Sequence, residues 1–165
     1  MAFVGGAVMI KAFVVGIAVA LLLTLPASAA CEPVAYAADE ALLHDVLTAM
    51  DLEYTVAWND DGDPFWTVSQ AAIVFTIAAY DRQSAGKYAS LLFYAGWETS
   101  LQPSLVTINA WNMTSRFGRA YIDEAGDPAI ELDLLLTGGV TSQTIREYIL
   151  IFVSALSDLG IALEL

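Results

Sequence analysis

The stretch that decides the fold is "WNMTSRFGRAYIDEAGDPAIELDLLLTGG", residues 111–139. Two alternating runs, "FGRAYIDE" and "PAIELDLLL", flank the turn sequence "AGD" and predict a β-hairpin. Centring the turn on its glycine places Tyr121 opposite Glu131 and Arg119 opposite Asp133. This register gathers the apolar side chains on one face, and a slip of one residue would destroy that sorting. We therefore expect the charged residues on a solvated face, with Arg119 and Asp133 as a cross-strand ion pair.

A short helix is predicted before the hairpin, in "SLQPSLVTINAWNMTSR", residues 100–116. Ser100 or Thr99 is a suitable N-cap, and Pro103 fits the first turn. Apolar residues at three-residue spacing predict the buried side; they are Leu105, Ile108 and Trp111. Arg116 is expected at the C-terminus of this helix, where the helix dipole favours a positive charge.

A longer helix is predicted after the hairpin, in "TSQTIREYILIFVSALSDLG", residues 141–160. Its apolar residues recur every three or four positions, which is typical of a helix that covers a core. Thr141 or Ser142 is expected to cap it, and Gly160 is expected to end it in the left-handed conformation.

Upstream of the hairpin the pattern predicts one helix and then strands. "DEALLHDVLTAMDL" carries one apolar stripe behind Asp39, which is a suitable N-cap. "LEYTVAW" alternates, "NDDGDP" is a turn sequence, and "KYASLLFYAGWE" is a further strand. "FWTVSQAAIVFTIAAYD" is too long for one unbroken strand, so a bend is expected near residues 70–72. The order α-β-β-β-α-β-β-α predicts an α+β domain: an antiparallel sheet of about five strands with helices on one face.

The N-terminus has the pattern of a secretory signal. In "MIKAFVVGIAVALLLTLPASAA", Lys11 precedes an apolar run that ends in Pro26 and small residues. We expect cleavage after Ala29 or Ala30, and translation from Met1 or Met9. The location expected from this signal is the periplasm or the outside of the cell.

This prediction divides the chain into a signal peptide (1–30), a short tether (31–37) and one folded domain (38–165). The alternatives to simple cleavage are an uncleaved membrane anchor and lipidation of Cys31, and only these would attach the protein to a membrane. Cys31 is the only cysteine, so no internal disulfide is expected.

The charge of the exported part excludes some classes of partner. Lys11 leaves with the signal, so five basic residues remain against 19 acids, a formal charge of −14 from residue 31 onward. A chain of this charge repels nucleic acid and anionic lipid, and it attracts basic partners. Nucleic-acid binding is therefore not expected.

Four stretches resemble a known family: "NDDGDPFWTVS", "SLLFYAGW", "INAWNMTSRFGRAYIDEAGDPAIELDLLLTGGVT" and the closing helix. They are similar to the YbjN family of small bacterial domains, which is glossed as a sensory-transduction regulator. The resemblance runs from about Asp39 to the end of the sequence, and Trp111 to Tyr121 is its most specific part. It implies a fold similar to that of type III secretion chaperones, small α+β dimers that hold extended partner segments. It implies no catalytic residue, and the signal sequence marks this chain as an exported member.

The sequence offers no recognisable set of catalytic or metal-binding residues, so neither catalysis nor a cofactor is expected. His44 is the only histidine and stands in the first predicted helix. Zinc coordination and Ser–His or Cys–His catalysis therefore lack their residues. Both Asp-Gly turns fail the EF-hand spacing. The acids of the first turn leave a looser cation site open as an alternative; its oxygen ligands would come from Asn59, Asp60, Asp61 and Asp63.

Aromatic residues are more numerous than helix packing alone requires, and a subset is expected to line a partner-binding groove between the sheet and the helix at 103–115. The candidate residues are Trp66, Trp97, Trp111, Arg119 and Tyr121. The function predicted is a non-enzymatic, chaperone-like or regulatory module that binds a protein or peptide, or a second copy of itself. The alternatives are an acidic cation- or small-ligand-binding module of the cell envelope and a hydrolase with an unrecognised site.

Overall fold

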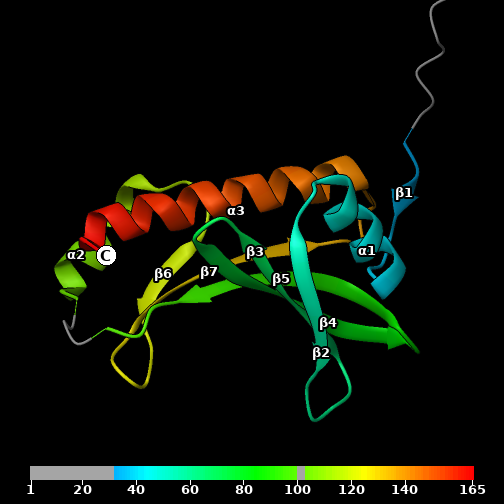
Figure 1. Cartoon of the computed structure of the whole chain (residues 1–165), viewed down its shortest axis with the longest axis horizontal. Helices are drawn as coiled ribbons and strands as arrows, with labels where there is room; N and C mark the ends of the chain where they lie inside the picture. Colours follow the sequence, from blue (N-terminus) through cyan, green and yellow to red (C-terminus); the bar gives the residue numbers. More distant parts are fainter. Residues whose placement is uncertain (1–31, 100–102) are drawn as a thin grey trace, which may run out of the picture. The chain divides into compact units, whose positions relative to one another are not determined.

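The computed structural model describes residues 32–99 and 103–165. The predicted signal peptide, Cys31 and Ser100 lie outside the described residues. Three helices lie over one face of a six-stranded antiparallel sheet (Figure 1). They are α1 (Glu40–Ala49), α2 (Leu105–Thr114) and α3 (Ser142–Leu163). The prediction of an α+β domain with an antiparallel sheet and helices on one face is confirmed.

The strands of the large sheet lie in the order β2-β3-β4-β5-β7-β6, and every neighbouring pair is antiparallel. Their bounds are β2 Glu53–Trp58, β3 Pro64–Gln70, β4 Ile73–Ser84, β5 Lys87–Gly96, β6 Arg119–Ile122 and β7 Pro128–Leu135. One more strand forms than the pattern predicts, because the expected bend near residues 70–72 is a full hairpin turn. Gln70 pairs with Ile73 there, and Ala71 takes a positive φ of 54°.

A second, two-stranded sheet joins the beginning of the described chain to the start of α3. Here β1 (Val34–Ala35) pairs with β8 (Val140–Thr141). The backbone of Ala38 also bridges to Tyr88 in β5. These residues include part of the stretch that the sequence pattern assigns to a tether, and no periodicity in that stretch signals the pairing.

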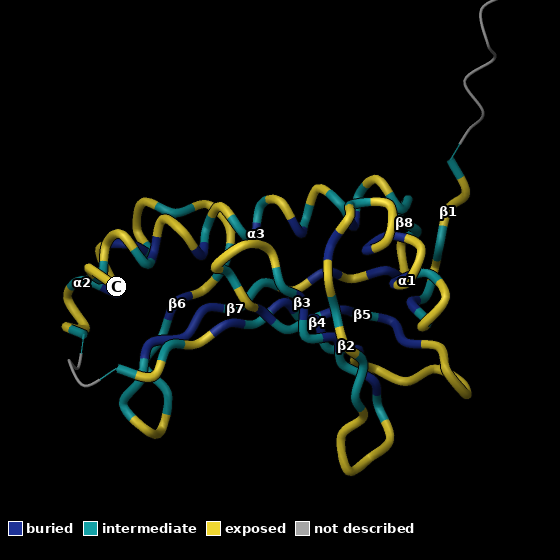
Figure 2. Tube along the Cα trace, viewed as in Figure 1, coloured by how far each residue is buried: buried dark blue, intermediate teal, exposed yellow. Residues whose placement is uncertain are grey.

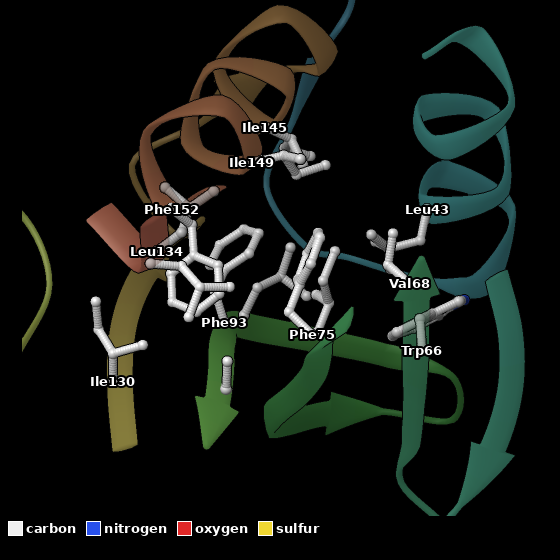
Figure 3. Close-up of a cluster of buried hydrophobic side chains, with 14 of the residues drawn as sticks. Leu43, Trp66, Val68, Phe75, Phe93, Ile130, Leu134, Ile145, Ile149 and Phe152 are labelled. Carbon is white, nitrogen blue, oxygen red and sulfur yellow. The ribbon is translucent and has the colours of Figure 1, made fainter. Parts of the chain in front are cut away.

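The core lies between the sheet and α1 and α3, where the strands present every second side chain (Figure 3). Phe75 and Phe93 point from β4 and β5 toward Phe152 of α3, with ring centroids 5.6 and 5.9 Å from it. α3 turns its buried residues toward the sheet and its exposed residues away from it (Figure 2). The α3 stripe predicted from residue spacing therefore covers the middle of the sheet.

The helix ends differ from the predictions at two places. α2 begins later than expected, because the side chain of Ser104 accepts the N–H of Val106 and caps the helix in place of Thr99. Leu105, expected on the buried side, is 65% exposed. α3 continues through Gly160, which stays helical and accepts the N–H of Leu165 at 3.0 Å. The left-handed residue that ends α3 is Glu164, so the prediction for Gly160 was wrong.

The hairpin of β6 and β7 forms, but its register differs from the predicted one by two residues. Arg119 lies opposite Glu131, not Asp133, and Tyr121 lies opposite Ala129. The reason is the turn: the Asp123 carboxylate accepts the backbone N–H groups of residues 125 and 127, both at 2.9 Å, and closes the loop between the two strands. A shift of two residues keeps each side chain on its predicted face.

Candidate binding face of the sheet

The sheet face opposite the helices is covered by no helix or strand of the described residues (Figure 1). We call it the open face. Because side chains alternate along a strand, the open face holds the residues that lie between the core positions. An antiparallel sheet commonly presents polar residues on such a face. Here the open face is mixed, because charged residues stand beside large apolar and aromatic ones; the latter include Phe65, Val74, Tyr80, Leu92, Tyr94 and Leu135.

One row of residues crosses the open face through all six strands, each opposite the next. The row runs Thr55, Thr67, Thr76, Tyr94, Glu131, Arg119. Three threonines occupy one half, and an aromatic and two charged residues occupy the other. The row offers hydroxyl, carboxylate and guanidinium groups along a line across the strands, so a bound chain would meet hydrogen-bonding groups at regular intervals.

Glu131 holds the charged end of the row together. Its Oε1 accepts the phenol O–H of Tyr121 at 2.6 Å, and its Oε2 accepts an N–H of Arg119. The Arg119 guanidinium carbon also lies 5.7 Å from the centre of the Tyr121 ring. Burial, together with the hydrogen bond to Glu131, raises the pKa of Tyr121 well above its ordinary value, so its hydroxyl stays protonated. Arg119 remains 72% exposed and keeps its other donors available.

The edge strand β6 is fixed to α2 by a side chain that imitates a neighbouring strand. Asn112 donates its amide N–H to the carbonyl of Ala120 at 2.9 Å, and it accepts the Ala120 N–H at 3.0 Å. Gly118, just before the strand, has φ +82°, and a Cβ there would lie 3.3 Å from Ile130. These contacts explain part of the "WNMTSRFGRAY" signature: it positions β6, and β6 positions Arg119 and Tyr121.

Two hairpin turns of the same design project on the open side of the sheet (Figure 1). In "NDDGDP" and "DEAGDP" the first residue accepts backbone N–H groups two and four positions later, and a glycine of positive φ follows. In the first turn Asn59 uses its oxygen in this way, and Asp63 is bound by Arg82. The described residues contain no group of three or more His, Cys, Asp or Glu side chains that could hold a metal ion. Of the four proposed cation ligands, Asn59 thus has its side-chain oxygen engaged in the turn, and Asp63 has one engaged by Arg82.

The structure separates the five candidate residues. Arg119 and Tyr121 lie together on the open face. Trp66 is 1% exposed beneath α1 and Trp111 is 6% exposed in α2, so neither contributes to the open face. Trp97 is half-buried beside Gly160 at the end of α3.

The sequence reasoning missed the threonines of the row and Tyr94. Their signal was available, because they alternate with core residues in β2 to β5, but the partner strands were not known.

Two further observations concern the rest of the surface. The single histidine, His44, lies 2.5 Å from the hydroxyl of Tyr54 through its Nδ1, and this pair joins α1 to β2. Within residues 32–99 and 103–165, no helix combines the length and the apolar character that a membrane span requires.

Comparison with known proteins gives one match. The model of a family described as "YbjN: Putative bacterial sensory transduction regulator" matches residues 39–164. No curated protein and no solved structure shows significant similarity to the chain.

Proposed function

The chain belongs to the YbjN family, and from that premise we propose that it is an exported, non-enzymatic module that binds an extended segment of a basic protein on its open face. The family description supports a regulatory or binding module. The observation that carries the proposal is the open face itself, where Phe65, Leu92 and Tyr94 stand among charged residues with no described element over them. Apolar and aromatic residues on a solvated sheet face support the proposal of an interaction surface.

Charge complementarity selects the partner. The open face carries Glu53, Glu131 and Asp133 against Arg119 and Arg82, and the two turns beside it add further acids. The chain from residue 31 onward has a formal charge of −14. A second copy would bring the same charge and be repelled, whereas a basic segment would be attracted and guided to the face.

An extended conformation suits the dimensions of this face. Opposed residues on neighbouring strands lie about 5 Å apart, so the row of residues across the sheet presents a contact at each strand. A segment in extended conformation would place alternate side chains on the apolar residues of the face and its polar groups on the threonines. Rigid, preformed strands reduce the entropy lost by the protein when the segment binds.

Site-specific photocrosslinking tests the proposal. A photoreactive amino acid is placed at Thr76, in the middle of the row, or at Leu150, which is 55% exposed on the outer side of α3. We expect a periplasmic partner of net positive charge to crosslink from position 76 and not from position 150, and the yield to fall in about 0.5 M salt because charges are then screened within a few ångström. Equal labelling from the two positions, or an acidic partner, would contradict the proposal.

Export is tested separately by the N-terminus of the protein in the cell. Mass spectrometry of the periplasmic fraction is expected to find a chain that begins at Ala30 or Cys31. An additional mass of acyl chains on Cys31 would replace simple cleavage by lipidation. Retention of the first 30 residues in the whole population would refute cleavage.

A further inference from the structure

Among the arginines and lysines of the described residues, Arg116 is the one that forms no ion pair there. The other four are all paired with carboxylates: Arg82 with Asp63, Lys87 with Asp39, Arg119 with Glu131, and Arg146 with Glu32. The Arg116 guanidinium carbon lies over the ring of Phe117, 5.4 Å from its centre. In a chain with 19 acids, an arginine left without a carboxylate is available for a ligand.

Arg116 lines a groove between the C-terminal end of α2 and the middle of α3, with a volume of about 460 Å³. Trp111 and Phe117 supply apolar surface on the α2 side. On the α3 side the groove is lined by Ile151, Ser154 and Asp158, which recur at three- and four-residue spacing and so share one face of the helix. The groove therefore has aromatic and aliphatic surface between two polar walls.

The two walls carry opposite charges that do not meet. Asp158 is exposed and, within the described residues, has neither an ion pair nor a hydrogen bond through its side chain. Arg116 and Asp158 line the same groove, yet their charged atoms are more than 4.0 Å apart, because no salt bridge joins them. A molecule between them could bind both charges at once.

Trp111, on the α2 side of the groove, also carries an unused donor. The indole Nε1 of Trp111 is buried, and it has no hydrogen-bond partner among the described residues. A buried N–H without an acceptor costs free energy, and such groups in native proteins call for a specific explanation. On the α2 side the exposed group that favours an acceptor such as a carboxylate is the Arg116 guanidinium.

We propose that this groove binds a small zwitterion with an apolar body, either a hydrophobic free amino acid or a hydrophobic dipeptide. The carboxylate lies at Arg116, the ammonium lies at Asp158, and the apolar side chain packs on Phe117 and Ile151. A zwitterion adds no net charge, so the acidic protein does not repel it as it would repel a fatty acid or a phosphate ester. This site is separate from the open face, because the groove lies among the helices.

Isothermal titration calorimetry tests the proposal with L-leucine and leucyl-leucine as probes, which differ in the separation of their two charges. Each is compared with its N-acetyl form, which lacks the ammonium, and its amide, which lacks the carboxylate. In Arg116→Gln we expect the affinity for the N-acetyl form to fall about tenfold and that for the amide to stay constant. In Asp158→Asn we expect the reverse.

Matched controls separate this pattern from a general effect of charge or of unfolding. Arg146→Gln and Asp45→Asn make the same changes of charge at positions that do not line the groove, and they should leave the affinities unchanged. Circular dichroism checks that each variant is folded. The proposal is overturned if neither zwitterion binds at about 10 mM, or if Arg116→Gln and Asp158→Asn affect both blocked forms alike.

Discussion

Replacing Asn112 with alanine is expected to destabilise the domain by about 2–4 kcal/mol. The substitution removes both hydrogen bonds to Ala120, which is 3% exposed. A buried donor or acceptor left without a partner costs about 1–3 kcal/mol. The two losses are partly offset by water at the sheet edge and by the better helix propensity of alanine, worth about 0.5 kcal/mol.

Urea unfolding followed by circular dichroism measures the change in the free energy of unfolding. The control is Asn109→Ala, which makes the same substitution at an exposed position one turn earlier in α2. Asn109→Ala should be neutral or slightly stabilising. If Asn112→Ala and Asn109→Ala differ by less than about 0.5 kcal/mol, the reasoning that Asn112 completes the β6 edge is refuted. A concentration-dependent increase in molecular mass is also expected for Asn112→Ala, because an uncovered strand edge pairs with other chains.

Three other outcomes follow from the structure. Gly118→Ala should lower the free energy of unfolding by about 1–2 kcal/mol in the same urea assay, because alanine is strained at φ +82° and approaches Ile130. Burial by itself raises the pKa of Asp39, but the hydrogen bond and the charge of Lys87, together with the α1 backbone N–H, lower the pKa overall. The ionised Asp39 carboxylate therefore stabilises the fold above its ordinary pKa, and this stabilisation is lost as the pH falls through the lowered pKa. In Asp39→Asn the free energy of unfolding should fall less steeply with acidification. Because the pKa of Tyr121 is raised in the folded protein, its protonated hydroxyl stabilises the fold below the ordinary pKa of tyrosine. This stabilisation is lost as the pH rises through the raised pKa. An absorbance titration of tyrosinate should show that one phenol ionises at a lower pH in Glu131→Gln than in the unmodified protein. Identical titration curves would contradict the hydrogen bond between Tyr121 and Glu131.

The fold class and most of the elements could be predicted from local patterns. Asp39 before an apolar stripe identified the start of α1, and Thr141 did the same for α3, because a capping side chain acts within its own turn. The long run between residues 65 and 81 hid a hairpin, since "QAAI" contains neither glycine nor asparagine. Ala71 adopts a positive φ there because the pairing of β3 with β4 on both sides holds the turn.

The candidate site was predicted only in part. Arg119 and Tyr121 were placed correctly on a solvated face, because the alternation of a strand assigns faces. The burial of Trp66 and Trp111 depends on which helix covers which strand, and the sequence does not contain that information in local form. The row across the open face was likewise invisible, because its members come from six strands that meet only in the folded sheet.

By itself the sequence determined which side chains of the hairpin face the core and which face solvent, because this depends on a period of two along each strand. It did not determine which charges meet. A shift of two residues preserves every face, so alternation cannot distinguish Arg119 opposite Asp133 from Arg119 opposite Glu131. The choice came from the closed turn at Asp123 and from Asn112 on the neighbouring helix. Only the tertiary structure therefore decided that Arg119 joins Tyr121 on Glu131 and that Arg116 is left without a partner among the described residues.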